Sequence, residues 1–341
     1  MRAAAAVNSA VAAGVGRTAL LVAAARAIET HRPDALARDP FAEHFVRAAP
    51  ASAGWPVRPD QVPAGEADPL WGRLGRYFGL RTRVLDDHLL RAARQGVRQV
   101  VLLGAGLDCR AFRLDWPPGC VVHEVDTAGM LTFKQAVLDR VGAVPTARRR
   151  VLAADLRLDW SEALRAAGFD AAAPTAWLAE GLLLYLPAAA ERRLVATVDR
   201  LSAPGSSLAY EVKPGVEAPR VRASPVYAAA RQRAGIDLLA LFDGEPRPDT
   251  AGDLTARGWT VTARTPYDFT AVHGRGPRPE PDDALAANRW CFATRGEEVR
   301  GRGRSRPAEH ADDGGRCGSP PTVTGCQETT ALVRRPVSRP G

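Results

Sequence analysis

Lysine is nearly absent from this chain: of its 46 basic residues, only Lys134 and Lys213 are lysines, and the rest are arginines. Abundant alanine, glycine and proline accompany this skew, and together they indicate a GC-rich coding bias. The arginines are scattered along the chain rather than clustered. Nucleic-acid-binding surfaces gather their cations and interleave aromatic side chains that stack on bases. The net charge of +8 therefore does not predict a nucleic-acid partner.

Cysteine is also scarce, and its spacing predicts no metal or redox site. The five cysteines form no CxxC pair and have no histidine pair beside them. An odd number at irregular spacing fits a reducing compartment. No apolar run reaches the roughly 20 residues that span a bilayer, and Met1–Ala13 lacks the pattern of a secretion signal. We expect a cytoplasmic protein with no metal and no membrane partner.

Helical and strand-like segments follow one another in a regular order. Three helical stretches come first, near 18–28, 41–48 and 70–94, with a proline-rich loop at 51–66. Short apolar runs, typical of buried strands, then alternate with further helical stretches. This alternation predicts an α/β fold with right-handed βαβ units and a doubly wound, mostly parallel sheet. The predicted strands are 99–103, 120–125, 150–154, 176–179, 207–212, 259–265 and 289–294, and the helices among them are 131–141, 161–167 and 188–201.

The chain is expected to hold one main domain with an extension at each end. We assign residues 17–296 to the domain, 1–16 to a flexible N-terminus and 297–341 to a disordered tail that has almost no apolar periodicity. Residues 213–248 interrupt the strand–helix order with several prolines and glycines around a short helix near 226–241. An insertion at this point lies over the carboxyl ends of the strands, where ligands bind. We therefore interpret it as a lid-like segment.

The strongest functional signal is the segment VVLLGAGLDCR at 100–110. A buried strand runs directly into Gly104 and Gly106, and Asp126 follows 20 residues after Gly106, at the end of the next strand. Glycines at a strand end let the backbone turn tightly and approach a nucleotide. A carboxylate at the next strand end can accept hydrogen bonds from both ribose hydroxyls. NAD-binding and S-adenosylmethionine-binding folds share this pattern.

Two details favour S-adenosylmethionine over NAD. Cys109 replaces the third glycine of the dinucleotide fingerprint, and Asp108 beside it would repel a pyrophosphate. S-adenosylmethionine has no phosphate and carries a cationic sulfonium, so negative charge suits it. The second detail is Asp155 with Leu156 after the third predicted strand, where a carboxylate can accept the adenine amino group while the leucine packs on the ring. Neither lysine belongs to the Tyr-x-x-x-Lys pair that a nicotinamide-dependent oxidoreductase would use.

A further acid, Glu180, ends the fourth predicted strand. Four consecutive strands therefore end in the glycine pair, Asp126, Asp155 and Glu180. Acids at strand ends can also simply cap the helices that follow. Capping explains any one of them readily, but it explains the whole series around a glycine turn less well.

These segments resemble those of the leucine carboxyl methyltransferase superfamily, in particular its bacterial branch of S-adenosylmethionine-dependent methyltransferases. The resemblance spans about 15–295 and implies a Rossmann-like class I methyltransferase fold with S-adenosylmethionine as cofactor. It implies a ribose contact at Asp126, an adenine contact at Asp155 and Leu156, and a cofactor-facing acid at Glu180. The motifs, in order, are TALLVAAARAIETHRPDALARDPFAEHFV, RTRVLDDHLL, VVLLGAGLDCRAFRL, HEVDTAGMLTFKQAVL, ADLRLDW and AEGLLLYLP.

The resemblance also implies an arginine against the cofactor carboxylate. Arg81 matches that position, with Arg83 as the competing choice, and Arg26 in the first helix is a further basic residue near the same carboxylate. A guanidinium can bind a carboxylate through two parallel hydrogen bonds, which are stronger than neutral ones. The plainer interpretation of the two arginines in RTR is that both are solvated.

The methyl acceptor is not identified by these motifs. We expect a small-molecule or carboxylate-bearing acceptor that is methylated on a carboxylate or hydroxyl oxygen. A carboxylate needs no base, whereas a hydroxyl must lose a proton. Tyr185, Tyr210, Glu211 and His123 are conceivable helpers, and we assign no catalytic residue. A nicotinamide-dependent oxidoreductase and a non-catalytic S-adenosylmethionine-binding protein stay open as alternatives, and the oligomeric state is not predicted.

Overall fold

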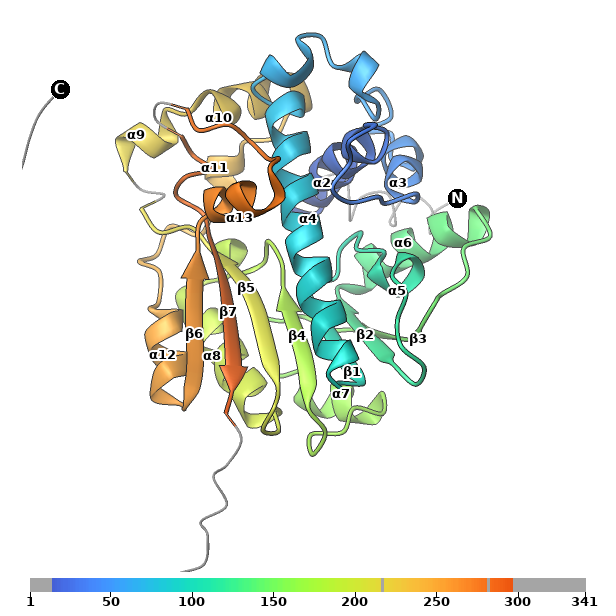
Figure 1. Ribbon diagram of the computed structural model, residues 1–341, viewed down its shortest axis with the longest axis vertical. Helices are drawn as coiled ribbons and strands as arrows, with labels where there is room; N and C mark the ends of the chain where they lie inside the picture. The colour runs from blue at the N-terminus through green and yellow to red at the C-terminus, as the bar shows by residue number, and fades with distance from the viewer. Residues whose placement is uncertain (1–13, 216–217, 281–282, 297–341) are drawn as a thin grey trace, which may run out of the picture. The chain divides into compact units, whose positions relative to one another are not determined.

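The computed structural model describes residues 14–215, 218–280 and 283–296. These residues form a seven-stranded sheet in the order β3-β2-β1-β4-β5-β7-β6 (Figure 1). The first five strands are parallel, and β7 runs antiparallel between β5 and β6. The predicted α/β fold with a doubly wound, mostly parallel sheet is therefore confirmed. The strands are β1 (Gln99–Leu103), β2 (Val121–Asp126), β3 (Arg148–Ala153), β4 (Thr175–Ala179), β5 (Ser207–Val212), β6 (Trp259–Arg264) and β7 (Arg289–Arg295).

Helices precede the sheet and connect its strands. The predicted N-terminal helical segment is present, and it is followed by helices that alternate with the strands. The α-helices are α2 (Gly14–Thr30), α3 (Ala42–Ala48), α4 (Trp71–Arg94), α5 (Arg110–Arg113), α6 (Ala128–Arg140), α7 (Ser161–Ala166), α8 (Ala188–Arg200), α9 (Pro219–Arg222), α10 (Pro225–Ala229), α11 (Leu238–Leu241), α12 (Thr250–Ala256) and α13 (Pro266–His273). Short 3-10 turns are η1 (Pro59–Gln61), η2 (Gly65–Ala67) and η3 (Leu183–Tyr185), and η4 (Ala230–Ala234) is a π-helical turn.

Strand β1 lies inside the sheet and is buried on both faces, as its unbroken apolar run predicts. Side chains alternate across a strand. Val100 and Leu102 accordingly join the core that includes α4 and α6. Val101 and Leu103 join the core that includes α8 on the other face. Figure 1 shows α4 crossing one face of the sheet, with α8 on the opposite side.

Helices α2 and α4 pack against each other over the sheet. In α4, apolar residues recur every three or four positions, and Leu80, Val84, Leu85 and Leu89 are buried as that period predicts. Helix α2 is apolar on nearly all sides. It therefore packs between neighbouring helices, and ten of its 17 residues are buried. The N-terminal helices thus form part of the main core.

Strand β3 departs from the prediction. Its apolar run was expected to be buried on both faces, yet its residues are exposed or half-buried, and Val151 is 45% exposed. The reason is its position, because β3 pairs only with β2 and forms an edge of the sheet. Arg148 and Arg150 at its start keep this edge charged, which disfavours pairing with another chain.

The insertion and the chain ends also differ in detail from the prediction. The single helix expected near 226–241 is broken, because Gly235 adopts a left-handed conformation with φ of +63° between η4 and α11. Helix α2 begins at Gly14, inside the segment 1–16 that was expected to be flexible. Residues 1–13 and the expected tail 297–341 lie outside the described residues. In the part of the chain that is described, no helix has the length and apolar character to cross a bilayer.

Candidate functional site

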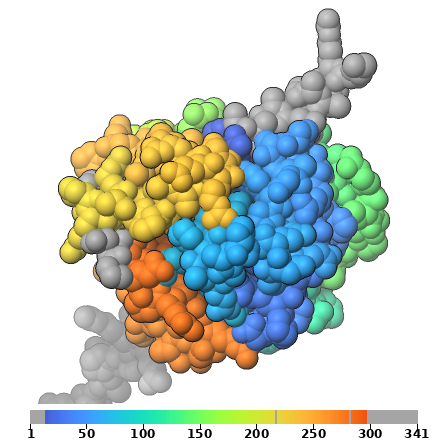
Figure 2. Space-filling view, turned by 90° about the horizontal axis from the view of Figure 1, so that it is seen from above, coloured from blue at the N-terminus to red at the C-terminus, as the bar shows by residue number. Residues whose placement is uncertain are grey.

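A cavity of about 500 Å³ lies at the carboxyl ends of the parallel strands. Its walls come from these strand ends, from α2 and α4, and from the insertion after β5. Figure 2, seen from above the strand ends, shows the N-terminal helices and the insertion covering this end of the molecule. The structure brings every predicted cofactor-binding residue to this one cavity: Arg81, Gly104, Gly106, Asp126, Asp155, Leu156 and Glu180.

The glycine turn after β1 is held by the end of β2. Gly104 and Gly106 have φ values of +65° and +43°, which side-chain-bearing residues rarely adopt. The amide of Gly106 donates a 2.7 Å hydrogen bond to Oδ2 of Asp126. The carbonyl of Val125 accepts from the Gly104 amide at 2.9 Å. A Cβ on Gly104 would lie 3.0 Å from Leu182, so the turn also needs a bare backbone for packing.

Asp108 lines the cavity, and its negative charge is balanced by the neighbouring Arg110. Its carboxylate accepts a 2.7 Å hydrogen bond from the Arg110 amide and forms an ion pair with the Arg110 guanidinium. Burial would raise the pKa of Asp108, and the charge of Arg110 lowers it below the ordinary value. The repulsion of a pyrophosphate expected at this position is therefore offset by Arg110. That electrostatic distinction from NAD-binding folds is weaker than the sequence suggests.

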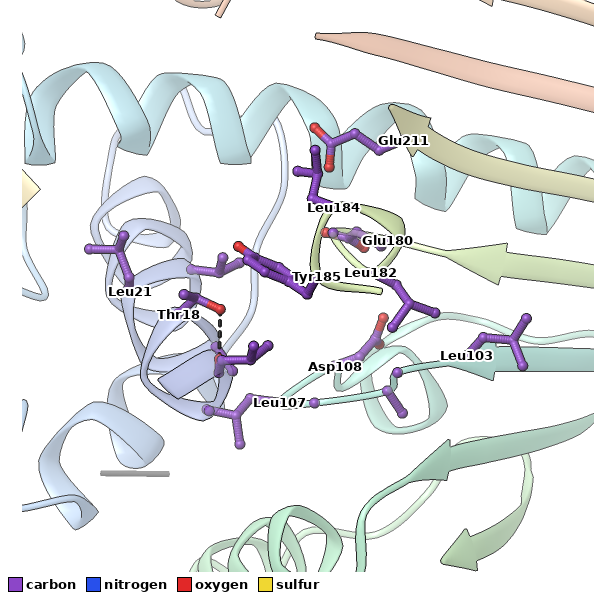
Figure 3. A pocket seen from close by; sticks show the side chains of 18 of the residues that line it. Thr18, Leu21, Leu103, Leu107, Asp108, Glu180, Leu182, Leu184, Tyr185 and Glu211 are labelled. Carbon is purple, nitrogen blue, oxygen red and sulfur yellow. Dashed lines mark hydrogen bonds between the residues drawn. The ribbon is translucent and has the colours of Figure 1, made fainter. Parts of the chain in front are cut away.

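Arg81 bridges two carboxylates from neighbouring strand ends. Its Nη2 lies 2.8 Å from Oε1 of Glu180, and its Nη1 lies 2.7 Å from Oε2 of Glu211. Arg110 reaches the second oxygen of Glu180 at 2.7 Å. Burial would raise the pKa of Glu180, but Arg110 and Arg81 together hold it well below its usual range. Figure 3 shows Glu180 and Glu211 at the ends of their adjacent strands.

The two candidate arginines have different environments. Arg81 is 5% exposed and lines the cavity, with its guanidinium 4.5 Å above the ring of Phe78. The side chain of Arg83 is 46% exposed and pairs with Asp87 on the same helix. Arg83 therefore fits the solvated alternative, and Arg81 does not. Arg26 also lines the cavity, buried, with Nη1 3.7 Å from Asp39.

Asp155 and Leu156 lie on the side of the cavity next to the sheet edge. Asp155 forms an ion pair with Arg157 at 2.7 Å, and its side chain is 33% exposed. The hydrogen bond from Arg157 lowers the pKa of Asp155. Leu156 is buried, with 7% of its surface exposed, and supplies an apolar side chain to the cavity wall beside this charged group.

The four conceivable helper residues separate into two pairs. Tyr185 and Glu211 line the cavity, and Figure 3 shows Tyr185 directed from η3 toward α2. His123 lies away from it, in the core, with its ring 6.0 Å from that of Phe169. Burial lowers the pKa of His123 to about 4, with the charge of Arg150 as a smaller cause. Tyr210 belongs to the core that includes α8.

Sequence reasoning missed three residues that shape the site. Arg110 holds Asp108 and Glu180, although it stands in the same glycine-turn motif. Lys213 lines the cavity as a buried cation, and its rarity in the chain was the available signal. Tyr227 reaches the cavity from α10, and no local pattern in the insertion indicates this.

The lining suits S-adenosylmethionine. Acids at the strand ends can accept from its hydroxyl and amino groups, a buried arginine can meet its carboxylate, and a bare glycine backbone leaves room at the turn. The sheet has the strand order 3-2-1-4-5-7-6, and its seventh strand is antiparallel to the others. Fold and site together define a class I S-adenosylmethionine-dependent methyltransferase.

Comparisons with known proteins identify the family. A model of the family described as leucine carboxyl methyltransferase matches residues 19–199. A protein of Streptomyces coelicolor is 66% identical over 283 residues, which cover 83% of this chain and 93% of the relative. A protein of Mycobacteroides abscessus is 47% identical over 273 residues, covering 76% and 89%. One of Saccharopolyspora erythraea is 45% identical over 274 residues, covering 80% and 93%.

All three relatives carry the name "Putative S-adenosyl-L-methionine-dependent methyltransferase". The chain belongs to the leucine carboxyl methyltransferase family, and its cofactor is S-adenosylmethionine. The resemblance found in the sequence motifs is thereby confirmed.

Proposed function

We propose that this methyltransferase acts on an oxygen atom of a small-molecule acceptor. The observation that carries the proposal is the composition of the cavity wall beyond the glycine turn. Apolar side chains from α2, η3 and the insertion make up most of it, including Leu21, Leu184 and Leu238. The buried ammonium of Lys213 lies on the same wall and attracts an anionic oxygen. An oxygen nucleophile suits this wall better than a nitrogen one.

We propose cofactor-binding roles for the residues that the cavity gathers. Asp126 accepts from the ribose hydroxyls, and Asp155 with Leu156 binds the adenine. Arg81 binds the cofactor carboxylate, and Glu180 faces its amino group. The support for these roles is that the residues lie on one cavity and in the order of their strands, with β3, β2, β1 and β4 adjacent in the sheet.

The contribution of the protein is orientation and exclusion of water. S-adenosylmethionine supplies a methyl group on a positively charged sulfur. Holding the acceptor oxygen in line with that group converts the encounter into an effectively unimolecular step. We propose that the covering helices and the apolar wall limit the contact of the acceptor with bulk water. A carboxylate acceptor needs no base; for a hydroxyl acceptor, Tyr185 and Glu211 are the two of the four candidate helpers that line the cavity.

Two alternative functions lead to different expectations. Membership of a methyltransferase family disfavours the nicotinamide-dependent oxidoreductase. A non-catalytic S-adenosylmethionine-binding protein predicts binding without turnover. The cytoplasmic location and the absence of a nucleic-acid partner stay predictions.

The proposal is tested by transfer of a labelled methyl group from S-adenosylmethionine to a panel of acids, phenols, alcohols and amines. Mass spectrometry locates the new methyl group, and mild base separates methyl esters from ethers. We expect label on oxygen, and reduced transfer by Asp126→Ala when S-adenosylmethionine is below saturation. Label on nitrogen or carbon would contradict the oxygen assignment. Tight cofactor binding with no transfer to any member would favour the non-catalytic alternative.

A further inference from the structure

The cavity is polarised across the sheet. The acids proposed to hold the adenosine follow β2 and β3, on one side of the glycine turn. Lys213 follows β5, which lies two strands from β1 on the other side. At about 4.8 Å per strand, this separation is roughly 10 Å in the plane of the sheet. Lys213 therefore belongs to the end of the cavity that is left for the acceptor.

Lys213 is a buried cation held by neutral oxygens. It is 6% exposed, and its Nζ donates to Oδ1 of Asn288 at 2.9 Å and to the carbonyl of Ala284. An ammonium has three N–H donors, so one has no hydrogen-bond acceptor in the described part of the chain. Among residues 14–215, 218–280 and 283–296, no carboxylate forms an ion pair with Nζ. The nearby Glu211 instead pairs with Arg81 and accepts a hydrogen bond from Tyr77.

Tyr227 supplies a second buried polar group that has no hydrogen-bond partner in the described part of the chain. The side chain is 7% exposed and lines the cavity from α10, and its ring centre lies 5.9 Å from Nζ of Lys213. Its hydroxyl is buried and has no hydrogen-bond partner within the described part of the chain. A buried hydroxyl without a partner is costly, and in the wall of a cavity a bound ligand can supply that partner.

The surroundings of these two groups are apolar. Val226, Leu238 and Leu285 line the same part of the wall. Burial lowers the pKa of Lys213 to about 8, partly opposed by the charges of Glu211 and Asp283, so the ammonium form persists at neutral pH. A buried ammonium that forms no ion pair within the described residues, beside apolar side chains, favours a ligand with one negative charge on an apolar body.

We infer that Lys213 and Tyr227 bind an anionic oxygen of the methyl acceptor, which is an apolar small molecule with a carboxylate or phenolate group. The inference rests on the proposed function, because it names the acceptor class for the same site. Lys213 supplies the charge and its remaining N–H, and Tyr227 donates its hydroxyl proton to the same oxygen group. Both are specificity-determining residues rather than groups that react.

The test uses full-length protein saturated with S-adenosylhomocysteine, and isothermal calorimetry with four kinds of probe. Octanoate and 1-naphthoate represent carboxylates, 4-phenylphenol represents phenols, and the methyl esters and octylamine are the comparisons. We expect the acids or the phenol to bind, and the esters and the amine to bind at least about tenfold more weakly, as loss of a charged hydrogen bond requires. Preference for carboxylates or for the phenol identifies which oxyanion the site takes.

Two variants and one control separate recognition from folding. Lys213→Met should weaken binding of the preferred acid by about 10- to 100-fold, and Tyr227→Phe by about 3- to 10-fold, with S-adenosylhomocysteine affinity unchanged. Arg222→Gln removes an exposed cation from the same insertion and should leave acid binding as in wild type. The unchanged affinity for S-adenosylhomocysteine shows that Lys213→Met has folded, and Tyr227→Phe tests the site independently.

The outcomes distinguish this inference from the proposed function. Wild-type acid binding in both Lys213→Met and Tyr227→Phe, or a preference for the esters or the amine, overturns the inference and leaves methyl transfer intact. Failure of every acid and phenol to bind the loaded protein overturns it as well. Failure of wild-type protein to transfer methyl to oxygen in the labelling experiment instead overturns the proposed function.

Discussion

The backbone amide of Gly106 donates a 2.7 Å hydrogen bond to the carboxylate of Asp126, 20 residues further along the chain. The glycine turn after β1 and the acid at the end of β2 are therefore one structural unit. The other oxygen of Asp126, Oδ1, accepts a 2.6 Å hydrogen bond from the Thr127 amide. The residue proposed to bind the ribose also fixes the turn that lets a nucleoside approach.

Asp126→Ala should weaken binding of S-adenosylhomocysteine by about 1–3 kcal/mol, because it removes the ribose acceptor and frees the turn. Asp126→Asn can still accept from Gly106 and should lose less. Calorimetry measures both. Asp139→Ala, an exposed acid on α6, is the matched control and should bind as wild type. An unchanged dissociation constant in Asp126→Ala would remove this residue from the site.

Gly104 and Gly142 provide a second matched pair. Both have positive φ, +65° and +64°, but a Cβ on Gly104 would lie 3.0 Å from Leu182, whereas a Cβ on Gly142 meets nothing within 4 Å. Alanine at either position should cost about 1 kcal/mol of unfolding free energy from backbone strain. Gly104→Ala should cost more than Gly142→Ala, because Leu182 must also shift. Only Gly104→Ala should also weaken cofactor binding. Urea unfolding and calorimetry test this, and equal cofactor affinities in the two variants would count against a role for the turn.

Arg81→Lys keeps the charge between Glu180 and Glu211 but loses the two-pronged geometry of the guanidinium. We expect affinity for S-adenosylhomocysteine to fall roughly 10- to 100-fold, the range for a lost charged hydrogen bond. Arg83→Lys alters an exposed arginine two residues away and should change nothing. A larger loss in Arg83→Lys than in Arg81→Lys would reverse the assignment.

His123 should make the protein sensitive to acid. Its pKa is lowered by burial to about 4 in the folded state, against about 6.5 when unfolded. The unfolded state binds more protons between these values, so the free energy of unfolding falls as the pH drops from 6.5 toward 4. His123→Leu should reduce that fall by about 2 kcal/mol. Urea titrations at pH 7 and pH 4.5 measure it, and parallel pH profiles for variant and wild type would refute it.

The sequence predicted the order of the elements well, because apolar period and glycine positions are local signals. Strand β1 is a continuous apolar run, and the turn at Gly104 follows it directly. The exposure of β3 was not predicted, because the edge position depends on which strands pair. The break in the insertion depends on the conformation of Gly235, which composition alone does not fix.

The candidate site was only partly predictable for the same reason. Acids at strand ends can be placed together from the sequence, since parallel strands end at one edge. Their partners cannot: Arg81 meets Glu211 across 130 residues, and Lys213 meets Asn288 across 75. Tyr227 reaches the cavity only through the folded insertion. Charge balance within the cavity is a property of the assembled fold.

The most direct test of the account is a crystal structure of the protein with S-adenosylhomocysteine. We predict the ribose at Asp126, the adenine against Asp155 and Leu156, and the amino acid carboxylate at Arg81, with the sulfur facing the compartment of Lys213 and Tyr227. A ligand bound in this cavity with its ribose away from Asp126, or bound outside the cavity, would contradict the account.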